Sequence, residues 1–253
     1  MKTGILKPVF KTVFKRKETK IFLLFSAYPL ILLIATFFKS AFMNLNADKG
    51  SLSFIEFFQA MLSVQYQMAL PLIALFYLVV TVFRDEIKRG YLFLYKDISK
   101  KKIFNAKIQS LSMVYIIYLF ALFLFSMFVY YVRLIQFDYT SKTFFPVGAD
   151  NIAYVVVGIL GVILVTVVGI LVVANLSLLT INSVAVVGGI VFVLVSTISK
   201  YFATLSWLFP NSYTEIYEKF GFGSSMILML VLFIIYAAVL TSIGKHFFKK
   251  LEY

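Results

Sequence analysis

Long blocks of apolar residues, separated by short polar stretches, dominate the pattern of this chain. A run of about 20 apolar residues matches the hydrocarbon thickness of a bilayer when it forms a helix. Such windows predict six membrane-spanning helices, at residues 21–38, 57–83, 108–132, 152–174, 184–205 and 224–243. The short alternating segments of a membrane β-barrel are not seen. We therefore expect an all-α integral membrane protein in which residues 1–253 form one domain.

Two connections between these windows need interpretation. Pro71 lies inside the second window and predicts a kink there. The polar stretch 175–183 predicts a tight turn between the fourth and fifth spans. The first window could be confused with a signal peptide. Its apolar run is longer than such peptides carry and no small-residue cleavage site follows, so we expect a retained span.

The segment before the first span has a helical pattern of its own. Apolar residues recur at helical spacing on one face, and lysines occupy another. The apolar positions are Ile5, Leu6, Val9, Phe10, Val13 and Phe14, and the lysines are Lys7, Lys11 and Lys15. We expect residues 1–20 to form an amphipathic helix in the membrane interface. The same helix could also contact a partner protein.

Another amphipathic segment, residues 207–223, is rich in aromatic side chains but too short and too charged to cross a bilayer. It is either a short helical hairpin in the outer leaflet or an interfacial loop. Within it, Phe209, Pro210 and Tyr213 are candidates for an outer gate.

Composition agrees with a membrane protein. The chain is 62% hydrophobic with a mean hydropathy of +0.96, and charged residues make up 14%, against about 25% in soluble domains. If the N-terminus is cytoplasmic, the inner segments 1–20, 84–107 and 244–253 carry 18 of the 24 Lys and Arg residues. The positive-inside rule then places both termini in the cytoplasm. Topology and anionic lipid account for the net charge of +13, so no nucleic-acid partner is needed.

The sequence lacks the patterns of the common catalytic sites. It has no phosphate-binding GxxxxGK[ST] loop, no HExxH or GxSxG motif and no cysteine, and its one histidine is His246. We expect no catalytic residue, metal site or cofactor in this chain. No Asp or Glu lies at the centre of a predicted span, which argues against ion-coupled transport, although a channel stays possible.

Uncharged polar residues do occur within the spans. Gln65, Tyr66 and Gln67 lie in the second span, and Asn175 lies at the inner end of the fourth. In hydrocarbon such groups need hydrogen-bond partners. They either join helices to one another or line a substrate path.

The most polar stretch is the loop 84–107 between the second and third spans. Ile87, Tyr91, Leu94 and Ile98 recur at i, i+4, i+7 and i+11, which gives one apolar stripe on a helix. A helix that docks into the groove of a partner needs such a stripe. Binding to a lipid surface would produce the same pattern.

The order of these features resembles that of the ABC-2 type permeases, the membrane subunits of ATP-driven exporters. In that family the loop after the second span has an acidic residue, a glycine, an apolar stretch and later lysines. Here the matching positions are Glu86, Gly90, residues 91–95, residues 98–100 and Lys107. The proline usual in this motif is absent, and Lys88 stands at its second acidic position.

The resemblance implies a coupling helix in this loop, formed around Glu86, Ile87, Gly90, Tyr91, Leu94, Ile98 and Lys107, that docks into a separate ATP-binding-cassette ATPase. ATP and Mg²⁺ would bind to that ATPase. It further implies a dimer of two copies, or of this chain with a paralogue, in a bacterial plasma membrane. The small size and aromatic content are similar to those of exporters of amphipathic peptide toxins. A permease for drugs or lipids and a non-transporting scaffold or signalling protein remain alternatives.

Overall fold

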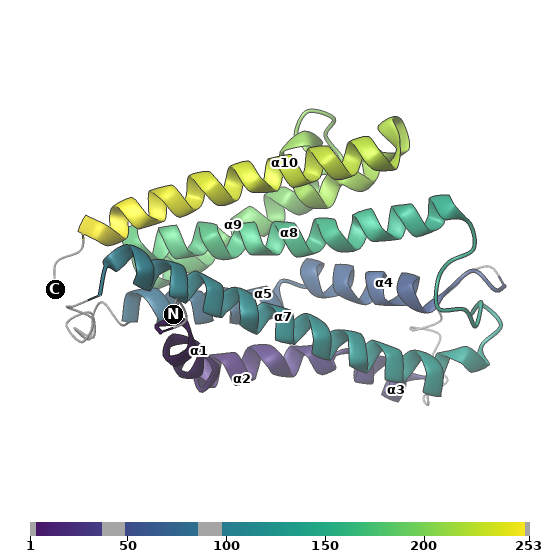
Figure 1. Cartoon of the computed structure of the whole chain (residues 1–253). Coiled ribbons are helices and arrows are strands. Elements are labelled where there is room, and N and C mark those ends of the chain that lie inside the picture. Colours follow the sequence, from purple (N-terminus) through teal and green to yellow (C-terminus); the bar gives the residue numbers. More distant parts are fainter. Residues whose placement is uncertain (1–3, 37–48, 86–97, 251–253) are drawn as a thin grey trace.

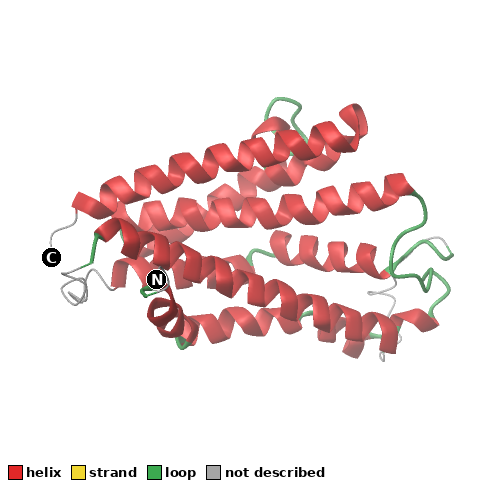
Figure 2. Ribbon diagram, in the orientation of Figure 1, coloured by secondary structure: helices red, strands yellow, loops and turns green. Residues whose placement is uncertain are grey.

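The computed structural model describes residues 4–36, 49–85 and 98–250. Within this part of the chain the structure is helical, and its one bridge between extended segments joins Leu52 to Thr140. The long helices run side by side along a common direction (Figures 1 and 2). Five members of the predicted coupling stripe and motif, Glu86, Ile87, Gly90, Tyr91 and Leu94, lie outside the described residues.

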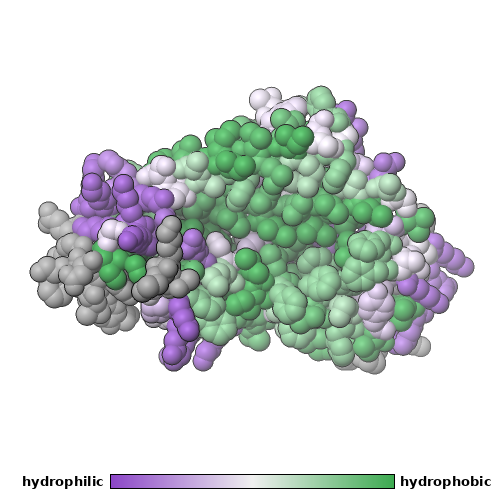
Figure 3. Space-filling model, viewed as in Figure 1, coloured by the Kyte–Doolittle hydropathy of each residue, from purple (hydrophilic) through white to green (hydrophobic). Residues whose placement is uncertain are grey.

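Four described helices are long and apolar enough to cross a membrane, and two bent helix pairs raise the possible number to six. The prediction of a helical, multi-pass membrane protein is therefore confirmed, whereas the count of six spans stays a prediction. Hydrophobic residues cover the middle of the molecule and hydrophilic residues gather toward its ends (Figure 3).

The first bent pair follows a short amphipathic helix. Helix α1 (Leu6–Phe14) buries Val9 and Val13. Helix α2 (Lys17–Leu24) continues through the turn η1 (Phe25–Ala27) into α3 (Pro29–Ala35), and the two parts meet at 42°. Helix α1 packs against α7. Its position in the membrane interface stays a prediction.

The second bent pair contains the predicted kink. Helix α4 (Phe54–Gln67) begins at a capping box between Ser53 and Glu56. It stops before Ala69, whose φ of 58° is left-handed, and α5 (Leu70–Val80) continues at 63° to it. Pro71 has no N–H to bond the carbonyl of Gln67, so an unbroken helix would lose a hydrogen bond here. The pair ends in one π-helical turn, η3 (Thr81–Asp85).

The third predicted span is confirmed as a helix but is longer than expected. Helix α7 (Lys100–Val132) begins inside the predicted loop 84–107, so the last residues of that loop are helical. The short turn η5 (Leu134–Gln136) follows it.

The fourth and fifth spans form a hairpin. Helix α8 (Ala149–Leu179) and α9 (Asn182–Ser199) pack on each other across the two-residue break at Thr180 and Ile181. The tight turn expected in residues 175–183 is thus present.

The outer segment 207–223 is mostly helical. It contains part of η6 (Ser206–Leu208), η7 (Pro210–Ser212) and the start of α10 (Tyr213–Lys250). Gly221 has a φ of 75°, which divides α10 into a short helix and a long one. The segment thus contains a short helix, and the choice between a hairpin in the outer leaflet and an interfacial loop stays a prediction. The long helix runs on to Lys250 and includes most of the predicted C-terminal tail.

One large apolar cluster joins α1, α2, α4, α5, α7, α8, α9 and the C-terminal end of α10. A smaller cluster, built on Val157, Tyr213, Ile216 and Met229, fixes the outer segment to α8 and α10. Helix α1 and the C-terminal end of α10 lie at the same end of the bundle, as do the start of α7 and the end of the second bent pair (Figure 1). We call this end the loop end.

Candidate functional site

The interior carries a polar cluster at the break of the second bent pair. Gln65 and Tyr66 are 3% and 4% exposed. The Gln65 side chain donates from Nε2 to the carbonyl of Phe25 over 2.6 Å, which joins α4 to the break in the first bent pair. The Tyr66 hydroxyl lies 2.5 Å from Ser196 Oγ on α9. Because Ser196 already donates to the Val193 carbonyl, Tyr66 is the donor in this pair.

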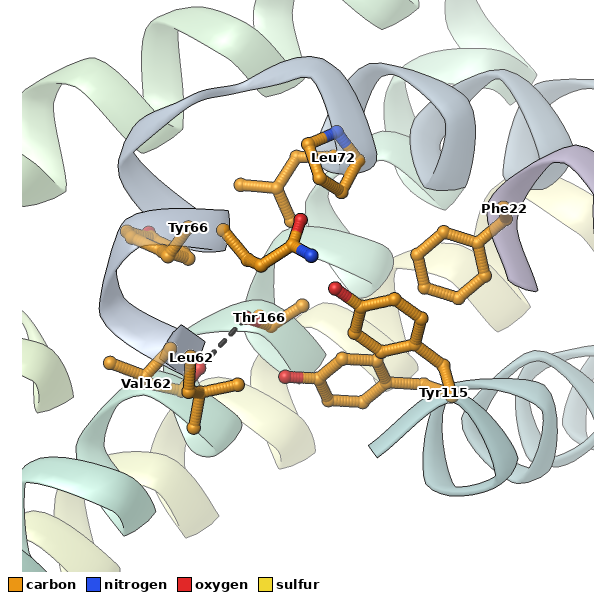
Figure 4. A pocket seen from close by; sticks show the side chains of 10 residues that line it. Phe22, Leu62, Tyr66, Leu72, Tyr115, Val162 and Thr166 are labelled. Atoms are coloured by element: carbon orange, nitrogen blue, oxygen red, sulfur yellow. Dashed lines mark hydrogen bonds between the residues drawn. The ribbon is translucent and has the colours of Figure 1, made fainter. Parts of the chain in front are cut away.

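These residues surround a small pocket that we call the inner pocket (Figure 4). Tyr115 and Tyr118 of α7 and Thr166 of α8 also line it, and its free space is about 10 Å³. The Tyr115 ring points into this space from α7 (Figure 4). A volume of this size holds about one water molecule. The inner pocket therefore has no room for any larger group.

On its other side, Tyr66 borders a polar pocket of about 170 Å³ that also includes Gln67. We call it the outer pocket. It lies between α4, α8, α9 and the start of α10, and its lining includes the charged residues Lys200 and Glu215. Helices α4 and α8 come close at Gly158, where a Cβ would meet the end of the Gln59 side chain. Of the three neighbouring polar residues predicted in span two, Gln65 and Tyr66 thus face the interior and Gln67 is exposed.

Asn175 is far along α8 from this cluster. Its Nδ2 donates to the carbonyl of Leu240 on α10 over 3.0 Å and to Leu171 over 2.8 Å. The side chain is 6% exposed, and Gly244 of α10 packs next to it. Asn175 therefore makes the contact between helices that is one of its two predicted roles. It does not line the two pockets described above.

The three candidates for an outer gate are packed into the bundle. Phe209 contacts Phe192 of α9, with 5.7 Å between ring centroids. Pro210 is buried against α8 at Gly161, where a Cβ would lie 2.6 Å from the Pro210 carbonyl oxygen. The Tyr213 hydroxyl donates to the Trp207 carbonyl over 3.3 Å. The first two contacts hold the segment against α9 and α8, so opening a gate here would require them to break.

At the loop end, Lys107 is buried rather than solvated. It is 1% exposed, and its Nζ donates to the Val82 carbonyl in the π-helical turn over 2.8 Å. The same Nζ lies 5.2 and 5.6 Å from the ring centres of Phe83 and Phe248. Lys107 therefore has no surface for direct contact with a partner, but it joins α7 and α10 to the end of the second bent pair.

Two arginines add to this junction. Arg16 donates to the Thr81 carbonyl over 3.0 Å, from the connection between α1 and α2. Arg84 donates to the carbonyls of Thr180 and Ser177 at the end of α8. Cations favour the C-terminal ends of helices because unpaired carbonyls give those ends partial negative charge. We call Arg16, Thr81–Asp85, Lys107 and Phe248 the loop base.

Ile98, the one described member of the predicted stripe, is partly buried and packs against the main apolar cluster. It therefore contacts the chain's own core. The other members lie outside the described residues, so their docking role stays a prediction.

Sequence reasoning missed several residues of these sites. Tyr115 and Tyr118 were hidden among the apolar residues of the third span, although Ser110, Leu111, Val114, Tyr115, Tyr118, Leu122 and Ser126 form its buried face at helical spacing. Those spacings are the signal that could have revealed them. The contacts of Arg16 and Arg84 gave no such signal, because they depend on residues distant in the sequence. Among the described residues, no group of three or more His, Cys, Asp or Glu could hold a metal ion.

Comparisons with family models, with curated proteins and with solved structures give no match for this chain.

Proposed function

We propose that this chain is the permease subunit of an ATP-driven exporter and moves amphipathic or hydrophobic peptides out of a bacterial cell. In this proposal it lies in the plasma membrane with both termini in the cytoplasm. A separate ATP-binding-cassette ATPase hydrolyses ATP and docks on the segment 84–107. The proposal rests on the resemblance to ABC-2 permeases and on the geometry of the loop base.

The contacts of the loop base support coupling between the loop and the transmembrane helices. The part of the loop outside the described residues joins Asp85 to Ile98, just before α7, so a force on it acts on both of these ends. Buried contacts connect them to other helices: Lys107 to Val82, Arg84 to the end of α8, and Phe83 to Phe104 and Phe248 with centroids 5.4 and 6.2 Å apart. A well-packed junction transmits displacement because interiors are close-packed. A displacement of the loop on docking would therefore move α5, α7, α8 and α10 together.

The surface around the loop base suits an acidic partner. Exposed lysines come from three separate segments at the loop end, namely Lys7, Lys11, Lys15, Lys17 and Lys20, then Lys101 and Lys102, and finally Lys249 and Lys250. Such a rim also attracts anionic lipid. The apolar stripe of the loop fits either partner. Only a measurement of ATPase binding separates docking into a protein groove from contact with lipid.

Exposed apolar faces on α9 and α10 could contact a second permease chain. Along α9, Val187, Val191, Leu194 and Ile198 recur at helical spacing, and each is at least half exposed. Helix α10 presents Ile227, Ile234 and Ile235 in the same way. In a bilayer these faces contact lipid or another permease chain. A dimer, of two copies or with a paralogue, would enclose a transport path from two bundles.

The test is association with an ATPase. The chain is purified with each ATP-binding-cassette ATPase encoded beside it, and co-elution and ATP turnover are measured with and without the chain. We expect a stable complex whose ATP turnover differs from that of the free ATPase. A chain that associates with no ATPase would refute the exporter proposal and leave the scaffold reading.

A permease for lipids or drugs is a second candidate, favoured by an apolar pocket that lies between the breaks of the two bent pairs. It differs from the peptide exporter in substrate alone. Competition between an amphipathic helical peptide and a lipid-like probe for stimulation of ATP turnover separates the two.

A further inference from the structure

A third pocket lies where both bent pairs break, and it opens on the apolar side of the bundle. Its volume is about 400 Å³, which is within the range of small-molecule sites. We call it the lateral pocket. Exposed apolar side chains surround it: Leu24 and Ile31 from the first pair, Met68 and Leu70 from the second. A molecule dissolved in the hydrocarbon of a bilayer would meet this opening directly.

The two helix breaks meet at this pocket. The turn Phe25–Ala27 interrupts the first pair, and Met68 and Ala69 interrupt the second. Broken helices persist at membrane depth where the irregular backbone is buried in protein or lines a cavity. In many membrane transport proteins, interrupted spans form the substrate site. Lining a cavity is therefore a second explanation, besides Pro71, for the break at Met68 and Ala69.

Gln65 lines the pocket and carries a hydrogen-bond acceptor without a partner among the described residues. The Phe25 carbonyl accepts but does not donate, so the amide atom facing it must be Nε2. The other atom, Oε1, is therefore fixed as an acceptor. It is buried and has no hydrogen-bond partner in the part of the chain that the structure describes. An unsatisfied buried acceptor is costly, and a ligand with a donor would recover part of this cost.

The space beyond Gln65 limits the size of the donor. Gln65 lines both the lateral pocket and the inner pocket, whose free space is about 10 Å³. That is room for one group the size of a water molecule, such as a hydroxyl. None of the residues that line these two pockets is charged. A charged or bulky head would be desolvated without a partner, which is costly.

We propose that the lateral pocket binds a neutral single-chain amphiphile from the membrane. Its aliphatic chain fills the apolar pocket between the two breaks. Its hydroxyl enters beside the inner pocket and donates to Gln65 Oε1. This inference does not depend on an ATPase partner, so it stands or falls separately from the export function.

The test uses fluorescence quenching by 11-bromo-1-undecanol in nanodiscs. Trp207 is the chain's one tryptophan, so Trp207→Phe gives a background in which a reporter is added at the pocket rim by Leu70→Trp. The reference reporter is Ala238→Trp, on an exposed position of α10 that measures partitioning into the bilayer alone. The methyl ether of the same bromoalcohol is the probe without a donor.

We expect saturable quenching at position 70 and only linear quenching at position 238. The ether should bind about three- to tenfold more weakly than the alcohol, as expected for the loss of one hydrogen bond. Gln65→Leu should remove this preference, whereas Gln67→Leu, the same change at an exposed position, should keep it. Ala27→Phe, which fills the pocket, should abolish saturation.

Two results would overturn the proposal. The first is linear quenching at position 70, which means that the pocket holds no bound amphiphile. The second is equal affinity for alcohol and ether in the chain with native Gln65, which means that Oε1 receives no hydrogen bond. The second comparison needs no substitution at Gln65, so it remains decisive even if Gln65→Leu fails to fold.

Discussion

Replacing Lys107 by methionine tests the loop base. Methionine keeps much of the side-chain volume but removes the ammonium, and so removes the bond to the Val82 carbonyl. A hydrogen bond from a charged donor contributes about 1.5–3 kcal/mol. Contacts with the rings of Phe83 and Phe248 add about 0.5–2 kcal/mol when desolvated. The cost of burying an ammonium offsets part of this sum.

The net loss that we expect for Lys107→Met is about 2 kcal/mol, since the Val82 carbonyl is left buried without its side-chain donor. For a chain of this size that loss lowers the Tm by roughly 4–8 °C. The assay is thermal unfolding of the purified chain in detergent. Lys102→Met is the matched control, because Lys102 is exposed on the same first turns of α7. A Tm equal to that of Lys102→Met would show that the buried ammonium does not stabilise the loop base.

Two further tests concern the contacts of α9 with its neighbours. Gly189→Ala places a Cβ 2.5 Å from Val173 Cγ2 and should destabilise the chain by about 1–3 kcal/mol. Gly223→Ala is the control and should have little effect, because a Cβ there meets no atom within 4 Å. Equal unfolding curves for the two variants would contradict the close approach of α9 to α8. A double-mutant cycle with Tyr66→Phe and Ser196→Ala should give a coupling energy of about 0.5–1.5 kcal/mol. Additive changes in stability would mean that this hydrogen bond is absent.

The sequence predicted the class and most helices because hydrophobic length is a local property. The kink at Pro71 was also predictable, since proline removes a backbone donor whatever surrounds it. The place of the break was not, because Ala69 carries the left-handed conformation. Nothing local marks an alanine for that role. The two helices that Ala69 joins, α4 and α5, each pack on α8, which is distant in the sequence.

The candidate sites were predicted less completely, for a related reason. The charge of Lys107 indicated a solvated loop, yet the residue is buried among Phe83, Phe104 and Phe248. Phe83 and Phe248 come from segments distant in the sequence, so a local pattern could not show that they enclose Lys107. Gln65 was recognised as polar within a span, but its bond to Phe25 required knowing that the two breaks meet. Long-range contacts thus decide which polar residues serve structure and which face a pocket.

The central claim is that the loop after the second bent pair couples this chain to an ATPase that drives peptide export. The direct measurement is ATP-dependent movement of an amphipathic helical peptide across vesicles that contain the chain and its ATPase. The double variant Tyr91→Ala with Leu94→Ala changes the loop stripe alone. We expect it to insert into the membrane normally and to lose both stimulated ATP turnover and peptide movement. Unchanged transport by this variant, or no ATP-dependent movement by the unmodified chain, would contradict the claim.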